Sequence, residues 1–238
     1  MPARRAPAPW WLAGALALLA GAARADGAAA PWLSAELGLA DLGAVPARLQ
    51  QPFDTPLPVR LSAAAGGQRV LLRHCADWLA QRDQAVGSDN DAAWRVVRHQ
   101  VVVCDALARL AAARPAPNAA LPAAPPDAAD TRRWPATLWV APSRDAAERL
   151  QQPGRTLASA SGVKRWATGA DGTRVLATRA WRVQLTELAR VDVDGDGWQD
   201  WLLRWEAQSQ QGSWTDARLV VLTRRAATEP LRELPPRP

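Results

Sequence analysis

The chain has 238 residues, of which 48% are hydrophobic, and its 29 basic and 23 acidic residues leave a formal net charge of +6. A chain of this length accommodates one large domain or two small ones. The basic residues are scattered and the net charge is small for the length, which argues against a nucleic-acid-binding protein. Tyrosine is absent and Lys164 is the only lysine, a bias typical of a high-GC bacterial genome.

Residues 1–25 are predicted to form a secretory signal peptide. Arg4 and Arg5 make a charged region, residues 10–20 an apolar core, and Ala23-Arg24-Ala25 an A-x-A cleavage site. The apolar run is shorter than the roughly 20 residues that span a bilayer. We therefore expect cleavage after Ala25 and a periplasmic or secreted protein with no membrane span in the mature chain.

Residues 26–112 are predicted to be mainly helical. Two apolar stripes at helical spacing lie on either side of Gly87-Ser88-Asp89, which supplies a break and an N-cap. We therefore expect a helical hairpin over residues 68–112. Its stripes consist of Leu71, Leu72, Cys75, Trp78 and Leu79, then Trp94, Val97, Val101, Cys104 and Leu107.

The only two cysteines, Cys75 and Cys104, each lie on the apolar stripe of a predicted helix. Folding of the hairpin would bring them together, and in an oxidising compartment such a pair is predicted to form a disulfide. The alternative is a catalytic thiol with His74 or His99. His74 adjoins Cys75 in sequence, so on a helix the two side chains point about 100° apart, and the disulfide is favoured.

The second half of the chain has a different pattern. Prolines deny residues 113–130 both a helix and a central strand, so we expect a Pro/Ala-rich linker and a domain boundary there. In residues 131–227, short strand patterns alternate with turn signals such as Ala170-Asp171-Gly172, which predicts an antiparallel β-meander of five or six strands. Residues 228–238 are expected to be a disordered tail. The predicted fold class is α+β: a disulfide-clipped helical hairpin, then a β-meander with a calcium-binding hairpin loop.

The loop between two of these strands is unusually acidic. Its positions 1, 3, 5 and 9 are aspartates and its position 6 is a glycine. Crowded carboxylates repel one another unless a cation neutralises them, and Ca²⁺ takes six to eight oxygen ligands. The predicted Ca²⁺ ligands are the side chains of Asp192, Asp194, Asp196 and Asp200 and the backbone carbonyl of Trp198. The alternative is a solvated Asp-Gly turn, which needs only one such pair.

The residues on both sides of the loop alternate between apolar and polar, as strands do. Glu187 interrupts the apolar face before the loop, where a bulge is expected, and position 12 is Leu203 rather than the glutamate of an EF-hand. Residues 185–206 therefore resemble the D-x-D-x-D-G-x-x-D calcium hairpin of FG-GAP and VCBS-type repeats. The resemblance implies calcium coordination by the five residues above and no particular activity. The single copy does not predict a propeller.

Eleven of the 13 tryptophans follow the predicted cleavage site. Trp201 and Trp205 share a strand face with Leu203, so they are predicted to lie in the core. Trp198 and Trp214 lie in predicted loops and are candidates for a binding surface.

No common catalytic motif is present: the chain has no G-x-S-x-G, no H-E-x-x-H and no phosphate-binding glycine loop. The pattern favours a non-enzyme, namely an exported calcium-binding protein that acts as a binding or scaffold module for a cell-envelope protein or glycan. The alternative is a cell-envelope hydrolase, or its accessory module, with a structural Ca²⁺. A carboxylate pair for glycoside hydrolysis can assemble from distant positions, so the enzyme alternative stays open.

Overall fold

The structure is a computed structural model that describes residues 30–121, 130–169 and 172–235. The predicted signal peptide, residues 122–129 of the predicted linker and the last three residues of the predicted tail lie outside the described residues.

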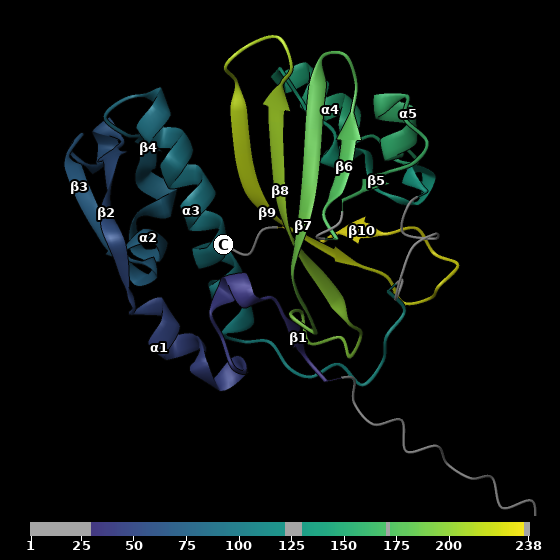
Figure 1. Cartoon of the computed structure of the whole chain (residues 1–238), viewed down its shortest axis with the longest axis horizontal. Coiled ribbons are helices and arrows are strands. Elements are labelled where there is room, and N and C mark those ends of the chain that lie inside the picture. Colours follow the sequence, from purple (N-terminus) through teal and green to yellow (C-terminus); the bar gives the residue numbers. More distant parts are fainter. Residues whose placement is uncertain (1–29, 122–129, 170–171, 236–238) are drawn as a thin grey trace, which may run out of the picture.

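An antiparallel sheet, here called the large sheet, forms the centre of the molecule (Figure 1). Its strands follow the order β10-β9-β8-β7-β6-β5, and β1 pairs with β7 beside the bulged part of that strand. From β5 to β10 each strand therefore lies beside its neighbour in sequence, which confirms the predicted antiparallel meander. The strands are β1 (Trp32–Leu33), β5 (Ala167–Thr168), β6 (Arg174–Ala177), β7 (Trp181–Val191), β8 (Asp200–Ser209), β9 (Thr215–Thr223) and β10 (Arg232–Glu233).

A bulge in β7 changes the sheet face to which its side chains point. The register with β8 shifts between Glu187 and Ala189, at the position that the sequence predicts. Val183 and Leu185, before the bulge, belong to the core on one face of the sheet, whereas Ala189 and Val191, after it, belong to the core on the other face. Without the extra residue all four would share a face.

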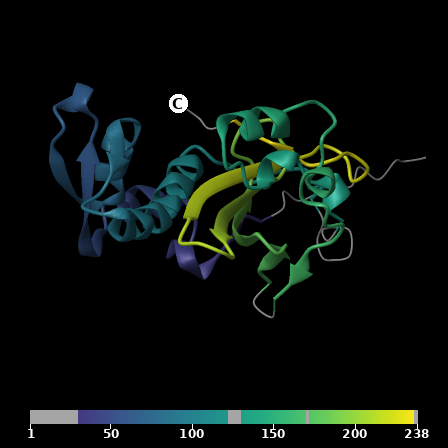
Figure 2. The same cartoon turned by 90° about the horizontal axis from the view of Figure 1, so that it is seen from above.

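The N-terminal half adds a three-stranded sheet and three helices, and this small sheet has the order β3-β2-β4. Figures 1 and 2 show α3 lying between the small sheet and the large sheet. The strands are β2 (Pro52–Leu61), β3 (Arg69–His74) and β4 (Ala85–Gly87). The α-helices in the described residues are α1 (Val45–Leu49), α2 (Cys75–Gln81), α3 (Asp91–Leu110), α4 (Arg144–Leu150) and α5 (Leu157–Ser161).

The first helix of the predicted hairpin is shorter than the sequence suggests. Residues 69–74, expected to be helical, form β3, where Val70 and Leu72 are more buried than the alternating residues between them. The apolar residues at 71, 72 and 75 fit a helical stripe, but pairing with β2 selects the period of a strand. His74 then caps α2, because its Nδ1 accepts the Asp77 backbone N–H.

The disulfide prediction is confirmed. Cys75, the first residue of α2, is bonded to Cys104 in α3, and their Cα atoms are 4.9 Å apart. Both cysteines are buried in the first core. The bond therefore joins α2, which follows directly from the small sheet, to the helix that packs on the large sheet.

Two apolar cores cover the two faces of the large sheet. The first joins the small sheet and α3 to one face and includes residues from both halves of the chain, among them Val59, Val101, Leu202 and Val221. The second lies on the opposite face and includes Trp134, Leu157, Trp201 and Trp205. The two regions that the sequence separates at residues 113–130 therefore share a core. Trp201 and Trp205 lie in the interior, as predicted.

The segments predicted to be a linker and a tail are both packed in their described parts. Ala116, Ala120 and Leu121 are buried. Leu231 is buried in the second core, and residues 232–233 form β10 at the edge of the large sheet. In both segments the apolar residues are few and are separated by prolines and arginines. They therefore form no periodic pattern from which these contacts could be predicted.

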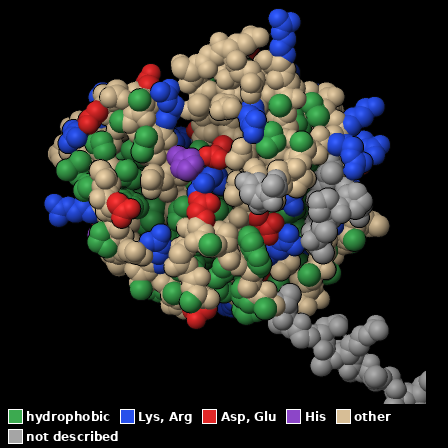
Figure 3. All heavy atoms as spheres, in the orientation of Figure 1, with side chains coloured by type: hydrophobic (Ala, Val, Ile, Leu, Met, Phe, Trp, Pro, Cys, Tyr) green, Lys and Arg blue, Asp and Glu red, His purple; other side chains and the backbone are tan. Residues whose placement is uncertain are grey.

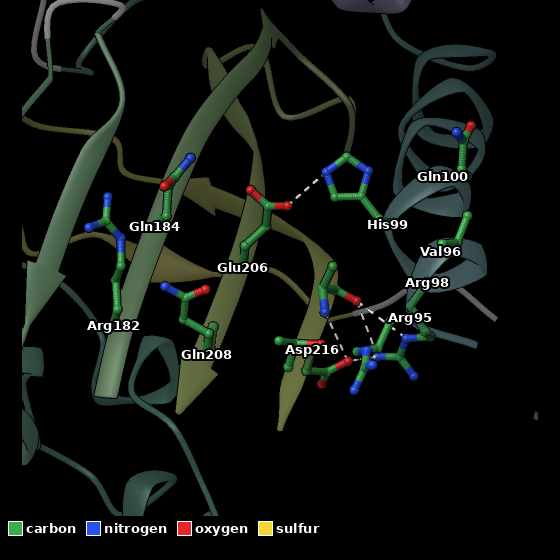
Figure 4. A pocket seen from close by; sticks show the side chains of 13 residues that line it. Arg95, Val96, Arg98, His99, Gln100, Arg182, Gln184, Glu206, Gln208 and Asp216 are labelled. Carbon is green, nitrogen blue, oxygen red and sulfur yellow. Dashed lines mark hydrogen bonds and ion pairs between the residues drawn. The ribbon is translucent and has the colours of Figure 1, made fainter. Parts of the chain in front are cut away.

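Two ion pairs join α3 to the outer part of the large sheet (Figure 4). His99 Nε2 lies 2.8 Å from Glu206, and Arg98 lies 2.6 Å from Asp216. The hydrogen bond to Glu206 raises the pKa of His99, and the same bond lowers the pKa of Glu206.

These shifts predict a pH window for the contact between α3 and the sheet. The contribution of His99 is fully present below the ordinary histidine pKa of 6.5 and is lost as the pH rises through the raised pKa. The contribution of Glu206 is present above its ordinary pKa of 4.5 and is lost as the pH falls through the lowered pKa. We expect wild-type protein to lose more thermal stability above pH 6.5 than a His99→Gln variant. Equal pH dependence of the two melting temperatures would contradict this.

Candidate metal centre

The acidic loop, residues 192–200, connects β7 to β8, and hydrogen bonds from its own backbone N–H groups to its aspartate side chains fix its shape. Asp192 accepts the N–H groups of Gly195 and Gly197 at 2.7 and 2.9 Å, and Asp194 accepts that of Asp196 at 3.1 Å. Gly197 has φ +85° and lies close to Pro117 and Asn118. A side chain at Gly197 would be strained by that φ angle, so the glycine is required by the turn.

Three of the predicted ligands lie close together in the structure. Ligand atoms of Asp192, Asp194 and Asp200 all lie within 4.8 Å of one another, where they can hold a metal ion. Asp192 and Asp200 are buried, while Asp194 is exposed to solvent. One side of the group is therefore walled by protein and the other is open to an entering ion.

Asp200 is the residue whose position most needs an explanation. It is fully buried, and its Oδ2 accepts the Val193 backbone N–H at 2.9 Å. Its Oδ1 is also buried, and a hydrogen bond from the buried Thr223 hydroxyl to this carboxylate acts to lower the pKa of Asp200. Burial raises the pKa of Asp200 to about 6, and the carboxylates of Asp194 and Asp196 act in the same direction. Keeping a buried carboxylate ionised is costly, and a cation at this point would offset that cost.

Asp196 is not a member of this group. Its carboxylate accepts the Trp198 N–H at 2.9 Å and forms an ion pair with Arg225 at 2.9 Å. Although burial acts to raise it, the pKa of Asp196 is lowered by these two partners. The side chain that the sequence places at position 5 of the site is therefore engaged in a contact outside the loop.

A distant segment closes the loop from outside. We call residues 114–118 the crossing segment. Arg114 and Asp192 exchange two backbone hydrogen bonds at 2.9 and 3.0 Å. Asn118 donates its backbone N–H and its side-chain amide to the Gly197 carbonyl, both at 3.1 Å, and its own carbonyl accepts the Gln199 N–H at 2.9 Å.

Sequence reasoning missed the crossing segment and Arg225. Asn118 lies 79 residues from Gly197, and Arg225 lies 29 residues from Asp196. No local spacing connects residues so far apart, and neither Asn118 nor Arg225 belongs to a motif. The proline-rich composition of residues 113–121 predicted a chain without helix or strand, and it carried no sign of the residue against which that chain packs.

The two loop tryptophans do not form one surface. Trp198 is half-buried within the acidic loop, whereas Trp214 is 42% exposed and its ring contacts Trp181 edge-on at 5.2 Å. They flank opposite ends of β8, a strand of 10 residues, which corresponds to roughly 30 Å. Each therefore belongs to a separate part of the molecule.

The chemistry of the acidic group suits a hard cation. Three carboxylates supply the oxygen ligands that Ca²⁺ and Mg²⁺ prefer.

None of the helices in residues 30–121, 130–169 and 172–235 has the length and apolarity of a membrane span. Comparison of the chain with protein-family models, with curated proteins and with solved structures gives no match. The interpretation of the site therefore rests on its own residues.

Proposed function

We propose that the protein is an exported calcium-binding module of the bacterial cell envelope, in which Ca²⁺ held by Asp192, Asp194 and Asp200 rigidifies the β7–β8 hairpin. The observation that carries the proposal is the fully buried carboxylate of Asp200, which lies beside those of Asp192 and Asp194. A solvated Asp-Gly turn has no reason to bury a carboxylate in this way. The Cys75–Cys104 disulfide supports an oxidising compartment.

The ion would act on more than the loop. The acidic loop bonds to the crossing segment, which begins shortly after α3 ends. Without a cation, repulsion among Asp192, Asp194 and Asp200 loosens the loop and weakens its contacts with Asn118. With Ca²⁺ bound, the loop and the crossing segment are held together. This fits a scaffold or binding module, whose surface must be rigid before a protein or glycan binds.

Thermal unfolding of the mature chain in EDTA and in about 1 mM Ca²⁺ tests the proposal. A ligand at a hundredfold excess over its Kd stabilises the folded state by about 2.7 kcal/mol. For a chain of this size that corresponds to a rise in melting temperature of roughly 5–10 °C. We expect this rise in the wild-type protein.

An Asp200→Asn variant is the matched control, because it keeps the shape of the side chain and removes its charge. It should show no calcium response, and in EDTA it should be at least as stable as the wild-type protein, since a neutral amide replaces a buried carboxylate whose pKa is raised to about 6. A wild-type protein whose melting temperature is the same in EDTA and in Ca²⁺ would refute the calcium site.

A further inference from the structure

A groove of about 400 Å³ separates the N-terminal half of α3 from the outer parts of β7, β8 and β9. Figure 3 shows basic, acidic and histidine side chains gathered where α3 meets the large sheet. The groove shares no residue with the candidate metal centre. Its properties can therefore be tested separately from calcium binding.

The groove exists because the side chains on one face of the large sheet change from apolar to polar along the strands. Toward the acidic loop, this face carries Leu202 and Val221, which pack in the first core with α3. Toward the other end, the same face of β7 and β8 carries Arg182, Gln184 and Gln208, and the strand register places Arg182 opposite Gln208 and Gln184 opposite Glu206. Polar side chains do not draw the helix onto the sheet, so a gap remains between them.

The walls of the gap are held by contacts between α3 and the sheet. Besides its ion pair with Asp216, Arg98 donates to the Ala217 carbonyl at 3.1 Å, and Arg95 donates to the Ser213 carbonyl at 3.0 Å. The pair of His99 and Glu206 spans the groove (Figure 4). Both carboxylates that line the groove are thus engaged in ion pairs, which favours binding over acid–base catalysis.

Three side chains that line the groove are available to bind a ligand. Arg182, Gln184 and Gln208 make no side-chain hydrogen bond or ion pair with any residue in the described parts of the chain, and they line the groove side by side on two paired strands (Figure 4). Together they present one guanidinium and two primary amides. A guanidinium forms paired hydrogen bonds with a carboxylate, and an amide both donates to and accepts from hydroxyl groups.

The charge of the groove favours an anion. Arg95, Arg98 and Arg182 carry three positive charges against two negative charges from Glu206 and Asp216, so the balance is 3 − 2 = +1, and protonation of His99 raises it to +2. Val96, which is 54% exposed, adds an apolar contact from α3. A volume of about 400 Å³ lies in the usual range for small-molecule sites.

We propose that this groove binds a small hydroxylated carboxylate, a sugar acid, with Arg182 on the carboxylate and Gln184 and Gln208 on the hydroxyl groups. The two parts of the ligand are recognised by different side chains. An acid without hydroxyl groups and a sugar without a carboxylate should therefore each bind more weakly than a molecule that has both.

Isothermal titration of the mature chain with three probes tests this assignment: D-glucuronate has both features, D-glucose lacks the carboxylate, and acetate lacks the hydroxyl groups. We expect D-glucuronate to bind at least about tenfold more tightly than either of the others, a difference of about 1.4 kcal/mol. D-glucuronate that binds no better than D-glucose, or that does not bind at all, would overturn the proposal.

Variants then assign the roles of the side chains. Arg182→Ala should reduce the affinity for D-glucuronate to that for D-glucose. Gln184→Ala with Gln208→Ala should weaken D-glucuronate and leave acetate unchanged. Arg144→Ala, which removes an arginine that is 91% exposed on α4 and outside the groove, is the matched control and should have no effect. A loss of affinity as large in Arg144→Ala as in Arg182→Ala would show non-specific attraction and reject the site.

Discussion

A Cys75→Ala/Cys104→Ala variant is expected to lose about 3–4 kcal/mol of unfolding free energy. The disulfide closes a loop between residues 29 apart in sequence, and on the chain-entropy model a loop of this length accounts for that amount. The bond also joins α2, next to the small sheet, to α3, which packs on the large sheet. Alanine is the right replacement because both positions are buried and a serine hydroxyl there would lack a partner.

Urea denaturation followed by tryptophan fluorescence measures this loss, with free energies extrapolated linearly to water. Wild-type protein should lose a similar amount in the presence of a reductant, and the double variant should not respond to the reductant. A reductant effect of the same size in the double variant would show that the loss does not come from the disulfide.

Replacing Trp201 with Ala is expected to cost about 3–5 kcal/mol, the usual range for removing a large buried aromatic side chain. Trp201 is fully buried in the second core, and its ring contacts that of Trp134 at 5.6 Å between centroids. Its indole also lies under two guanidinium groups, those of Arg174 at 4.4 Å and Arg190 at 5.1 Å. The substitution leaves a cavity and removes the ring on which a buried cation rests.

Two other variants separate the packing effect from a general sensitivity to tryptophan loss. Trp201→Phe should cost clearly less than Trp201→Ala, because the indole N–H has no hydrogen-bond partner to lose among the residues that the structure describes. Trp214→Ala removes a ring that is 42% exposed, so its cost should be the smallest of the three. Chemical denaturation of the three variants gives this order, and an equal loss at Trp201 and Trp214 would contradict the assigned core.

Short-range patterns predicted several parts of the fold correctly. The alternation in residues 181–191 and 201–206 identified the two long strands β7 and β8, and Glu187 on the otherwise apolar face located the bulge. The two cysteines were paired because each lies on an apolar stripe near the same turn. In each case the deciding residues are close in sequence, so the periodicity of a single element carries the signal.

Where a pattern of apolar residues fits both a helix and a strand, the sequence alone did not predict the correct element. Residues 69–74 have apolar positions that suit a helix or a strand, and pairing with β2 decided for the strand. Residues 232–233 became a strand only because the edge of β9 was available to them. Local propensity is weaker than such tertiary contacts.

The candidate metal centre and the groove beside α3 were likewise determined partly by the sequence and partly by the tertiary structure. By itself the sequence determined that Asp192, Asp194 and Asp200 belong to one loop, because a nine-residue spacing and two glycines are local properties. Only the tertiary structure decided that Asp196 pairs with Arg225, that Asn118 closes the loop and that Asp200 is fully buried. Arg182, Gln184 and Gln208 read as an ordinary solvent-exposed strand face until α3 is placed opposite them. Burial and the concentration of charge depend on elements far apart in the chain, and no spacing within one element encodes them.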